Sequence, residues 1–347
     1  MVARIALGSS AHLEFWLVNH DVKQITILGF DYALATAITG VIDLLSTAGV
    51  TWNMLNRQPR TPYFNVEIAS RDGVSVRCLH DLHLAAHRRI DQIEQTDLLL
   101  VPTIGGDIDK TLALNPEIIE CLQQHHARGT LIASNCTGAF FLAAAGLLDG
   151  RPATTHWGFI DQFRQEFPRV DLRPEQLVTN AGTVFCSGGG HAWFDLGLYL
   201  IERFCGHEVA VGCAKSFVID MGRESQLTYS ALNSRKYHMD TEILEVQSWL
   251  EEHYQEPVMI EAVAQRFGMS SRNFIRRFKK ATGDTPLSYL QALRLEAAKK
   301  LLEETNLPVE EVTSRVGYED ISSFTRLFCR RTGLPPRQYR QKFQRRR

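Results

Sequence analysis

Two similar segments decide the fold of the last part of the chain: MIEAVAQRFGMSSRNFIRRFKKATG at 259–283 and LPVEEVTSRVGYEDISSFTRLFCRRTG at 307–333. Each predicts a short amphipathic helix that ends at a glycine, Gly268 or Gly317, followed by a tight turn and a second helix. Glycine adopts the left-handed conformation that the turn needs, and serine caps the next helix. The two segments therefore predict two helix-turn-helix motifs in an all-α region.

The spacing of apolar residues separates a buried from an exposed face in each second helix. The side chains expected inside are Phe274, Ile275, Phe278 and Ala281 in the first copy, and Phe324, Leu327 and Phe328 in the second. The side chains expected outside are Arg272, Asn273, Arg276, Lys279 and Lys280, and then Ser322, Thr325, Arg326 and Arg330. Residues 286–304 predict one long connecting helix, which can set the two second helices in successive major grooves, roughly 34 Å apart.

Charge is distributed unevenly along the chain. The whole sequence has 38 Lys and Arg against 39 Asp and Glu, but from Pro257 onward we count 19 basic and 9 acidic residues. A basic end that carries paired helix-turn-helix motifs indicates a nucleic-acid ligand. The alternative is a basic helical face that is merely solvated.

The exposed residues of the two motifs divide by the chemistry of their side chains. Arginine can donate two hydrogen bonds to O6 and N7 of guanine, so base contacts are expected from Arg272, Arg276, Ser322 and Arg326, with Thr325 on the same surface. Asn273 is expected to read a base or hold a phosphate. Phosphate contacts are expected from Lys279, Lys280, Arg330, Arg331 and Arg337. Arg277 is left open between DNA and a helix acid.

The first two thirds of the chain alternate predicted strands and helices. Continuous apolar runs at 24–30, 97–102 and 130–136 predict buried parallel strands, and residues 31–49 and 115–129 predict helices. Further strands are expected in 61–80 and 176–190, with a helix at 191–206. This order predicts an α/β fold, a doubly wound parallel sheet covered on both faces.

The stretch SNCTG at 134–138 is the informative point of this region. A buried strand runs straight into a helix, which places Cys136 on a tight turn of the nucleophile-elbow kind, at a helix N-terminus that favours a thiolate or a bound anion. His156 could approach the thiol from a neighbouring strand. The simpler alternative is that Cys136 is a small buried residue without a functional role.

Two stretches carry family resemblances. The run RLEAAKKLLEETNLPVEEVTSRVGYEDISSFTRLFCRRTGLPPRQYR at 294–340, with the two motifs, resembles the DNA-binding domain of AraC-family transcription regulators over about residues 240–343. GTLIASNCTGAFFLAAAGLLDGRPATTHW at 129–157 resembles the PfpI/ThiJ-like, flavodoxin-like class I glutamine amidotransferase fold over about 24–220. More closely still, it is similar to the N-terminal domain of GlxA-type regulators, which precedes an AraC-type domain.

The second resemblance implies a site. It places Cys136 at the family's nucleophile position and His156 at the nearby histidine. The full set expected around a ligand is Cys136, Thr137, Gly138, His156, Gly105, Gly106, Ser187 and Gly188. Catalytic members also place an acid beside the cysteine, whereas here Leu34 or its neighbours stand at that place. Thiol activation would then rest on the helix end and on His156.

Together the resemblances imply a sequence-specific transcription regulator, with activation favoured. Its expected partners are double-stranded DNA, a small nitrogenous or carboxylate metabolite as effector, RNA polymerase and a second copy of the chain. The alternatives are a cysteine-dependent amidase, protease or glyoxalase-like enzyme, and a module whose α/β part only dimerises. The missing acid counts against the enzyme.

Bulk properties bound the organisation of the chain. With 347 residues, the expected parts are an N-terminal extension (1–23), an α/β sensing domain (24–220), a linker (221–240) and a DNA-binding domain (241–347). No apolar run approaches the ~18 residues of a membrane span, and no secretory signal is evident. Seven cysteines without disulfide or metal spacing predict reduced thiols in the cytoplasm, with no cofactor and no structural zinc.

Overall fold

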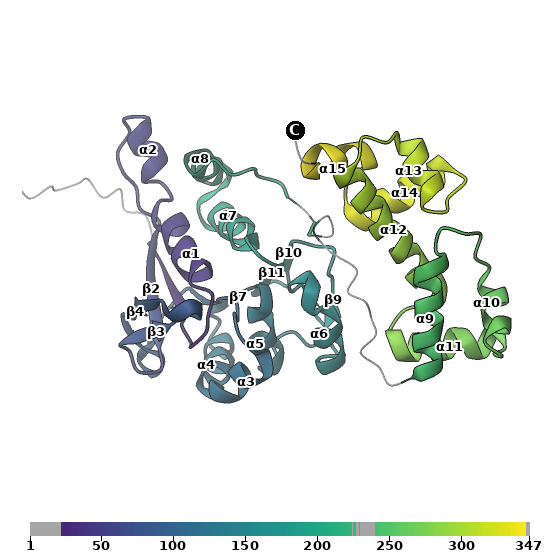
Figure 1. The fold of residues 1–347 in the computed structure, drawn as a ribbon. Coiled ribbons are helices and arrows are strands. Elements are labelled where there is room, and N and C mark those ends of the chain that lie inside the picture. Colours follow the sequence, from purple (N-terminus) through teal and green to yellow (C-terminus); the bar gives the residue numbers. More distant parts are fainter. Residues whose placement is uncertain (1–21, 224, 227–228, 230–239, 345–347) are drawn as a thin grey trace, which may run out of the picture. The chain divides into compact units, whose positions relative to one another are not determined.

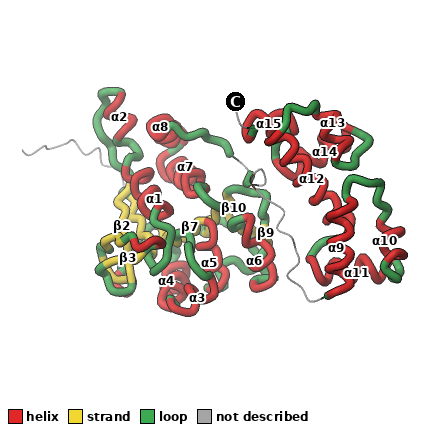
Figure 2. The backbone as a smooth tube through the Cα atoms, viewed as in Figure 1, coloured by secondary structure: helices red, strands yellow, loops and turns green. Residues whose placement is uncertain are grey.

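The computed structural model describes residues 22–223, 225–226, 229 and 240–344 (Figure 1). The expected extension 1–23 and linker 221–240 therefore lie largely outside the described residues. The described chain forms two compact units. The first comprises residues up to 155, 169–171 and 178–223, and the second comprises 156–168, 172–177 and the described residues beyond 223. The strands of the large sheet all belong to the first unit, whereas the described part from residue 240 onward is helical (Figure 2).

A seven-stranded sheet forms the centre of the first unit. Its strands, in spatial order, are β10 (Val178–Asn180), β11 (Val184–Ser187), β7 (Leu131–Asn135), β6 (Leu98–Val101), β1 (Lys23–Leu28), β2 (Phe64–Ser70) and β5 (Arg88–Arg89). Every neighbouring pair is parallel except β10–β11. All residues of β6 and β11 are buried, as the apolar sequence of β6 and of the first three residues of β11 predicts. The expected α/β sheet is confirmed, with one antiparallel edge strand.

Two short strand pairs lie outside this sheet. They are β3 (Ser75–Arg77) with β4 (His83–Ala85), and β8 (Pro152–Ala153) with β9 (Asp171–Leu172). The prediction that residues 74–80 continue the parallel sheet is therefore wrong. The strand pairs instead with the next segment of chain, β4, as an antiparallel hairpin.

Helices cover both faces of the sheet in the first unit (Figure 1). They are α1 (Thr36–Ser46), α2 (Thr51–Leu55), α3 (Ile108–Leu114), α4 (Pro116–Ala127), α5 (Ala139–Ala144), α7 (Ala192–Cys205) and α8 (His207–Phe217). Short 3-10 turns occur at Leu79–Asp81, Ile90–Gln92, Cys136–Gly138 and Trp157–Phe159, the last leading into α6 (Ile160–Glu166). The helix predicted from residue 31 begins only at Thr36, because Tyr32 has a left-handed φ of 66° and the Leu34 N–H donates to the carbonyl of Thr103.

The second unit contains two copies of one helical module. Its helices from residue 240 onward are α9 (Thr241–His253), α10 (Ile260–Arg266), α11 (Ser271–Thr282), α12 (Pro286–Glu304), α13 (Val309–Arg315), α14 (Ile321–Thr332) and α15 (Pro336–Phe343). One apolar core joins α9–α11 to the start of α12, and another joins the end of α12 to α13–α15. The long helix α12 thus belongs to both cores.

The two cores repeat the same aromatic pattern. Phe274, Phe278 and Tyr289 in the first core correspond to Phe324, Phe328 and Tyr339 in the second, each fifty positions later in the sequence. The tyrosine hydroxyls repeat a contact as well: Tyr289 donates to Glu251 at 2.9 Å and Tyr339 donates to Glu303 at 2.7 Å. The repeat seen in the sequence is therefore a repeat in three dimensions.

The turns of both motifs have the predicted glycine geometry, whereas the caps differ. Gly268 and Gly317 have φ values of 67° and 86°. Ser270 caps α11 by accepting from the Asn273 N–H, but the cap of α14 is Asp320, which accepts from the N–H groups of Ser322 and Ser323. The prediction of a serine cap in both copies is wrong for the second, because the preceding aspartate supplies a stronger, charged acceptor.

The close approach of α5 to the loop after β6 depends on Gly138. A Cβ atom on this residue would lie 2.6 Å from the carbonyl oxygen of Pro102 and 2.7 Å from that of Val101, and these backbone atoms cannot turn away. We predict that Gly138→Ala lowers the free energy of unfolding by about 1–3 kcal/mol, measured by urea titration. Unchanged stability would contradict this packing.

Candidate functional site

Cys136 lies on the tight turn between β7 and α5. Its φ of 58° is in the left-handed region, which non-glycine residues rarely occupy, and the strain is held by the buried strand before it and the helix after it. The residue is only 4% exposed. The backbone thus has the elbow geometry that the sequence predicts, but the thiol lies inside the protein.

Four groups surround the thiol of Cys136. The N–H groups of Thr137 and Gly190 and the hydroxyls of Thr103 and Thr137 contact it. Burial raises the pKa of the thiol above its ordinary value, and these hydrogen bonds act in the opposite direction without reversing the shift. The thiol is therefore protonated at neutral pH, in contrast to the activated thiolate that a helix end alone would favour.

The carboxyl ends of three adjacent strands bring together most of the predicted ligand set. Gly105 and Gly106 follow β6, Cys136, Thr137 and Gly138 follow β7, and Ser187 and Gly188 end or follow β11. Hydrogen bonds link these strand ends: the Ser187 hydroxyl donates to Asn135 at 2.8 Å, and the Asn135 amide donates to the Thr103 hydroxyl at 2.6 Å. Of the predicted set, Ser187 is therefore hydrogen-bonded to a neighbouring strand end.

Two loops at this edge of the sheet are hydrogen-bonded to each other. The Gly105 N–H donates to the carbonyl of Tyr32 at 2.9 Å, and the Leu34 N–H donates to that of Thr103 at 3.0 Å. The hydroxyl of Thr137 holds the second loop in place. It accepts a hydrogen bond from the Ile104 N–H and donates one to the Ile104 carbonyl, both at 3.0 Å. We call this arrangement, residues 32–34 paired with 103–105, the loop clip.

The residues expected to act on Cys136 make other contacts in the structure. Leu34, at the place where catalytic members of the resembling fold carry an acid, supplies an apolar side chain and a backbone bond to the loop clip. His156 belongs to a segment of the second compact unit, where its Nδ1 accepts from the Gly158 N–H and its ring packs against Trp157 and Phe159. Burial lowers the pKa of His156, which keeps the imidazole neutral.

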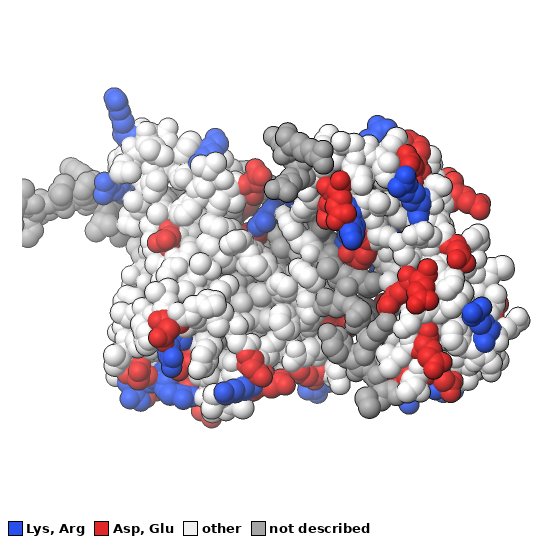
Figure 3. Space-filling model, viewed as in Figure 1, with Lys and Arg blue, Asp and Glu red and all other residues white. Residues whose placement is uncertain are grey.

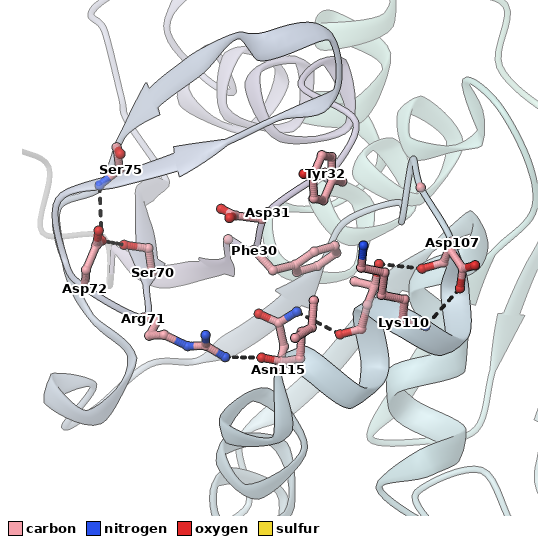
Figure 4. A pocket seen from close by; sticks show the side chains of 14 residues that line it. Phe30, Asp31, Tyr32, Ser70, Arg71, Asp72, Ser75, Asp107, Lys110 and Asn115 are labelled. Carbon is pink, nitrogen blue, oxygen red and sulfur yellow. Dashed lines mark hydrogen bonds between the residues drawn. The ribbon is translucent and has the colours of Figure 1, made fainter.

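A cavity of about 410 Å³ opens beside the loop clip, and the sequence did not predict it (Figure 4). It is lined by residues that follow β1 and β2 and by the first turns of α3: Gly29, Phe30, Asp31, Tyr32, Ser70, Arg71, Asp72, Ser75, Gly106, Asp107, Lys110, Thr111, Leu114 and Asn115. From the predicted ligand set it includes Gly106. The available signal was positional, because charged residues come directly after two neighbouring parallel strands.

The second helix of each motif exposes most of the residues predicted to contact DNA. On α11 the exposed side chains are Arg272, Ile275, Arg276, Lys279 and Lys280, with Asn273 half-buried. On α14 they are Ile321, Ser322, Ser323, Arg326, Arg330 and Arg331, with Thr325 half-buried. Arg337 is exposed on α15. Ile275, predicted to be inside, is 40% exposed, because Phe274 and Phe278 already fill the core side of the helix.

One arginine is held in the same way on each of the two helices. The Arg276 guanidinium donates to the side-chain oxygen of Asn273 at 2.9 Å, and that of Arg326 donates to the Ser323 hydroxyl at 3.1 Å. Both bonds join residues three apart on the outer face. Arg331 instead donates to Ser288 at 3.1 Å.

Arg277, which the sequence left undecided, pairs with acids. Its guanidinium contacts both oxygens of Asp240 at 2.7 Å and Glu242 at 2.6 Å, at the start of α9. These contacts raise its pKa further and tie α11 to α9. Arg277 therefore holds the module together, and it differs in role from its neighbour Arg276.

Charge is segregated within the second unit. Helices α11 and α14 contain no acidic residue, whereas they carry five and three basic residues, respectively. Acidic side chains instead gather on the face of this unit turned to the viewer in Figure 3. Helices α9 and α12 together contain seven acidic residues: Glu242, Glu245, Glu251, Glu252, Glu296, Glu303 and Glu304. The two outer faces of α11 and α14 thus form a basic surface suited to phosphate and base edges.

No described helix combines the length and apolar character of a membrane span. In the same part of the chain, no three or more His, Cys, Asp or Glu side chains converge as metal ligands would.

Family profiles match both parts of the chain. A profile of the DJ-1/PfpI family matches residues 42–203, and one of a helix-turn-helix domain matches residues 263–342. Among solved structures, a transcriptional regulator protein from Vibrio parahaemolyticus has a TM-score of 0.50 and 21% identity, and the match covers 57% of this chain and 100% of that one. This likeness concerns the fold alone.

Three similar proteins illustrate the curated relatives. The HTH-type transcriptional regulator CdhR of Pseudomonas aeruginosa is 30% identical over 274 residues, 79% of this chain and 80% of its own. GbdR of the same species is 27% identical over 300 residues, 86% of this chain and 80% of its own. The HTH-type transcriptional activator RhaS of Salmonella schwarzengrund is 40% identical over 119 residues, 34% of this chain and 41% of its own.

The burial of Cys136 predicts slow alkylation of its thiol. In native protein at pH 7, alkylation of Cys136 by iodoacetamide should be at least about tenfold slower than that of the half-buried Cys329, because burial both shields the thiol and raises its pKa. Peptide mass spectrometry at timed quenches measures both rates, and denatured protein, in which the two should react alike, is the control. Faster labelling of Cys136, with a midpoint below pH 7, would contradict this description.

Substitutions of the neighbours Arg276 and Arg277 are expected to have different effects on the melting temperature. Arg277→Gln should lower the melting temperature of the protein, because Asp240 and Glu242 lose their partner, and the difference should shrink as salt rises. Arg276→Gln, which breaks one exposed bond, is the matched control and should leave the melting temperature nearly unchanged. Equal melting temperatures for the two variants would remove the structural role of Arg277.

Proposed function

Because this chain belongs to the HTH-type transcriptional regulators that join a DJ-1/PfpI domain to an AraC-type helix-turn-helix domain, it is a DNA-binding transcription regulator, and we propose that its two motifs read adjacent major grooves under the control of a small effector. The proposal that the second unit binds DNA is supported above all by the repeat of one helical module. Two acid-free helices, each on a completely buried phenylalanine pair, present an arginine at the same helical position.

Base reading is assigned to the central outer face of each helix. Arg276 and Arg326, held by Asn273 and Ser323, suit guanine, and Arg272 and Ser322 lie one turn earlier on the same side. Ile275 adds an apolar group to this face, and we propose that it contacts the methyl group of a thymine. The exposed Lys279, Lys280, Arg330 and Arg337 are assigned to phosphate, which gives affinity without sequence information.

The connecting helix sets the spacing of the two motifs. Helix α12 has 19 residues, so it is about 28 Å long. Its two ends belong to different cores, and the Arg294 guanidinium donates to the carbonyls of Tyr254 and Glu256 at 2.7 and 2.8 Å. A rod of this length supports simultaneous insertion into grooves roughly 34 Å apart.

The α/β unit is proposed to sense rather than to catalyse. The buried protonated thiol, the leucine in place of an acid and the locally bonded His156 all support binding over turnover. The effector is proposed to be a small nitrogenous or carboxylate metabolite that shifts the preference of the protein between two states by a few kcal/mol at most. Activation of transcription with RNA polymerase as partner, action as a homodimer and a cytoplasmic location belong to the same proposal.

The proposal predicts a loss of sequence preference in two single variants. Arg276→Ala and Arg326→Ala should each weaken binding to the cognate promoter fragment by about 1–3 kcal/mol and weaken binding to random DNA much less. Fluorescence anisotropy at fixed salt measures both, after the promoter site has been selected from genomic fragments. Lys300→Ala, on α12, is a control for the loss of one positive charge from the unit.

The same assay tests Ile275. Replacing the operator thymines by deoxyuridine, one at a time, should reveal a position where the wild-type protein loses affinity and Ile275→Ala does not, because both changes remove the same contact. If the two arginine variants bind specific and random DNA with equally reduced affinity, Arg276 and Arg326 contact phosphate and not base edges. If the wild-type protein prefers no genomic fragment over bulk DNA, the function itself is contradicted.

A further inference from the structure

Helix α12 runs from the first helix-turn-helix module, with α9–α11, to the second, with α13–α15 (Figure 1). Its residues change core near the middle: Leu290 packs in the first core, whereas Leu295 packs in the second. The half-buried Arg294 lies between them. Its guanidinium donates to the carbonyls of Tyr254 and Glu256, which belong to the connection between α9 and α10. Arg294 therefore fastens α12 to the first module.

The same guanidinium also contacts the second module. Its central carbon lies 5.1 Å from the centre of the Tyr318 ring, a distance at which a cation is attracted to an aromatic face. Tyr318 directly follows the turn glycine Gly317 and packs against Phe324 of α14, with ring centroids 5.5 Å apart. Arg294 is thus bonded to one module and stacked on a side chain of the other, at the point where the two cores meet.

The turns of the two motifs have different surroundings. A Cβ atom on Gly317 would lie 2.8 Å from the carbonyl oxygen of Gln255, 2.9 Å from that of Tyr254 and 3.1 Å from the guanidinium carbon of Arg294. A Cβ atom on Gly268, the turn glycine of the first motif, would meet no atom of the described residues within 4 Å. The turn of the second motif therefore lies against the first module, whereas the turn of the first motif has open space at this position.

One further bond joins the modules at the surface. Arg331 of α14 donates to Ser288 in the first turn of α12 at 3.1 Å, but the Arg331 side chain is exposed, so water competes for this bond. Burial lowers the pKa of Arg294, because its guanidinium is partly removed from water. The contacts of Arg294 are therefore the stronger link between the modules.

The internal repeat supplies a comparison for Arg294. Gln344, fifty positions later, donates to the carbonyl of Thr305 at 2.9 Å and to the side-chain oxygen of Asn306 at 2.7 Å. These two residues belong to the connection between α12 and α13, which corresponds to the connection between α9 and α10. Both copies therefore fasten this connection, and Arg294 adds a contact with the other module.

We propose that Arg294 is a positioning residue for DNA recognition, which fixes α11 and α14 relative to each other and makes the protein select the spacing of its two half-sites. Insertion of one base pair between the half-sites moves the second by about 3.4 Å and rotates it by about 35° around the duplex. Two locked modules cannot follow this change and keep both sets of base contacts, whereas modules held to α12 only by their own cores can adjust. This inference rests on the reading of adjacent grooves proposed above, and it adds spacing to sequence as a determinant of specificity.

The test uses full-length protein and an operator selected from genomic fragments, with one base pair inserted between the half-sites that methylation protection locates. Fluorescence anisotropy gives the ratio of the dissociation constants for the inserted and the native duplex. We expect this ratio to be at least about tenfold for the wild type and less than about threefold for Arg294→Met. Because each ratio compares two duplexes for one protein, a general loss of positive charge or of active protein cancels.

Gln344→Met is the matched control, because it removes the corresponding bonds inside the second module, and it should keep the wild-type ratio. A second pair of variants leaves Arg294 in place. Gly317→Ala and Gly268→Ala both put a side chain on a residue with left-handed φ, but the new Cβ meets the first module at Gly317 and open space at Gly268. Gly317→Ala should therefore lower the ratio as Arg294→Met does, whereas Gly268→Ala should keep it.

Three results would overturn the inference: equal binding of the two duplexes by the wild type, a wild-type ratio in Arg294→Met, or an equally lowered ratio in Gln344→Met. If Arg294→Met fails to fold, seen as loss of binding to random DNA, the glycine pair decides, and equal ratios for Gly317→Ala and Gly268→Ala contradict the lock. In each of these cases a protein that still prefers its promoter remains a DNA-binding regulator. Failure of that function appears separately, as absence of preference for promoter DNA.

Discussion

Two buried phenylalanines, four residues apart, fix the orientation of each second helix in the helix-turn-helix motifs. Phe274 with Phe278, and Phe324 with Phe328, are essentially inaccessible to solvent, and burial of each is worth roughly 1.5–3 kcal/mol. Because the side chains on the opposite face must then point outward, the same burial that stabilises the modules also presents Arg276 and Arg326 to a ligand. The stability of each module and the exposure of its arginine therefore depend on the same packing interaction.

The α/β unit combines a strained backbone turn at Cys136 with a buried thiol. The strained elbow at Cys136 persists, but desolvation outweighs the four hydrogen bonds to the thiol and keeps it protonated. The neighbouring strand ends bond to one another through Ser187, Asn135 and Thr103. The open cavity lies beside the loop clip and is lined by Tyr32 and Gly106, whereas Cys136 is buried.

Local chemistry made much of this structure predictable from the sequence. The turn glycines, the phenylalanine periodicity and the apolar strands each impose a conformation on their own neighbourhood, and the two motifs and the parallel sheet follow from them. The failures involve competition between neighbours. Ile275 fits a helical apolar stripe, but the two phenylalanines leave it no room in the core, and Asp320 competes successfully with serine for the cap of α14. The cavity is not predictable in this way, because the segments that line it come together only through the order of the strands.

The central claim is that two equivalent helices read one duplex at neighbouring turns, and it is tested most directly by methylation protection of a selected operator bound to the full-length protein. The account predicts two clusters of protected guanine N7 atoms in the major groove, about one helical turn apart on one face, with Arg276→Ala exposing one cluster and Arg326→Ala the other. A single protected cluster, or protection lost together in both variants, would contradict the account.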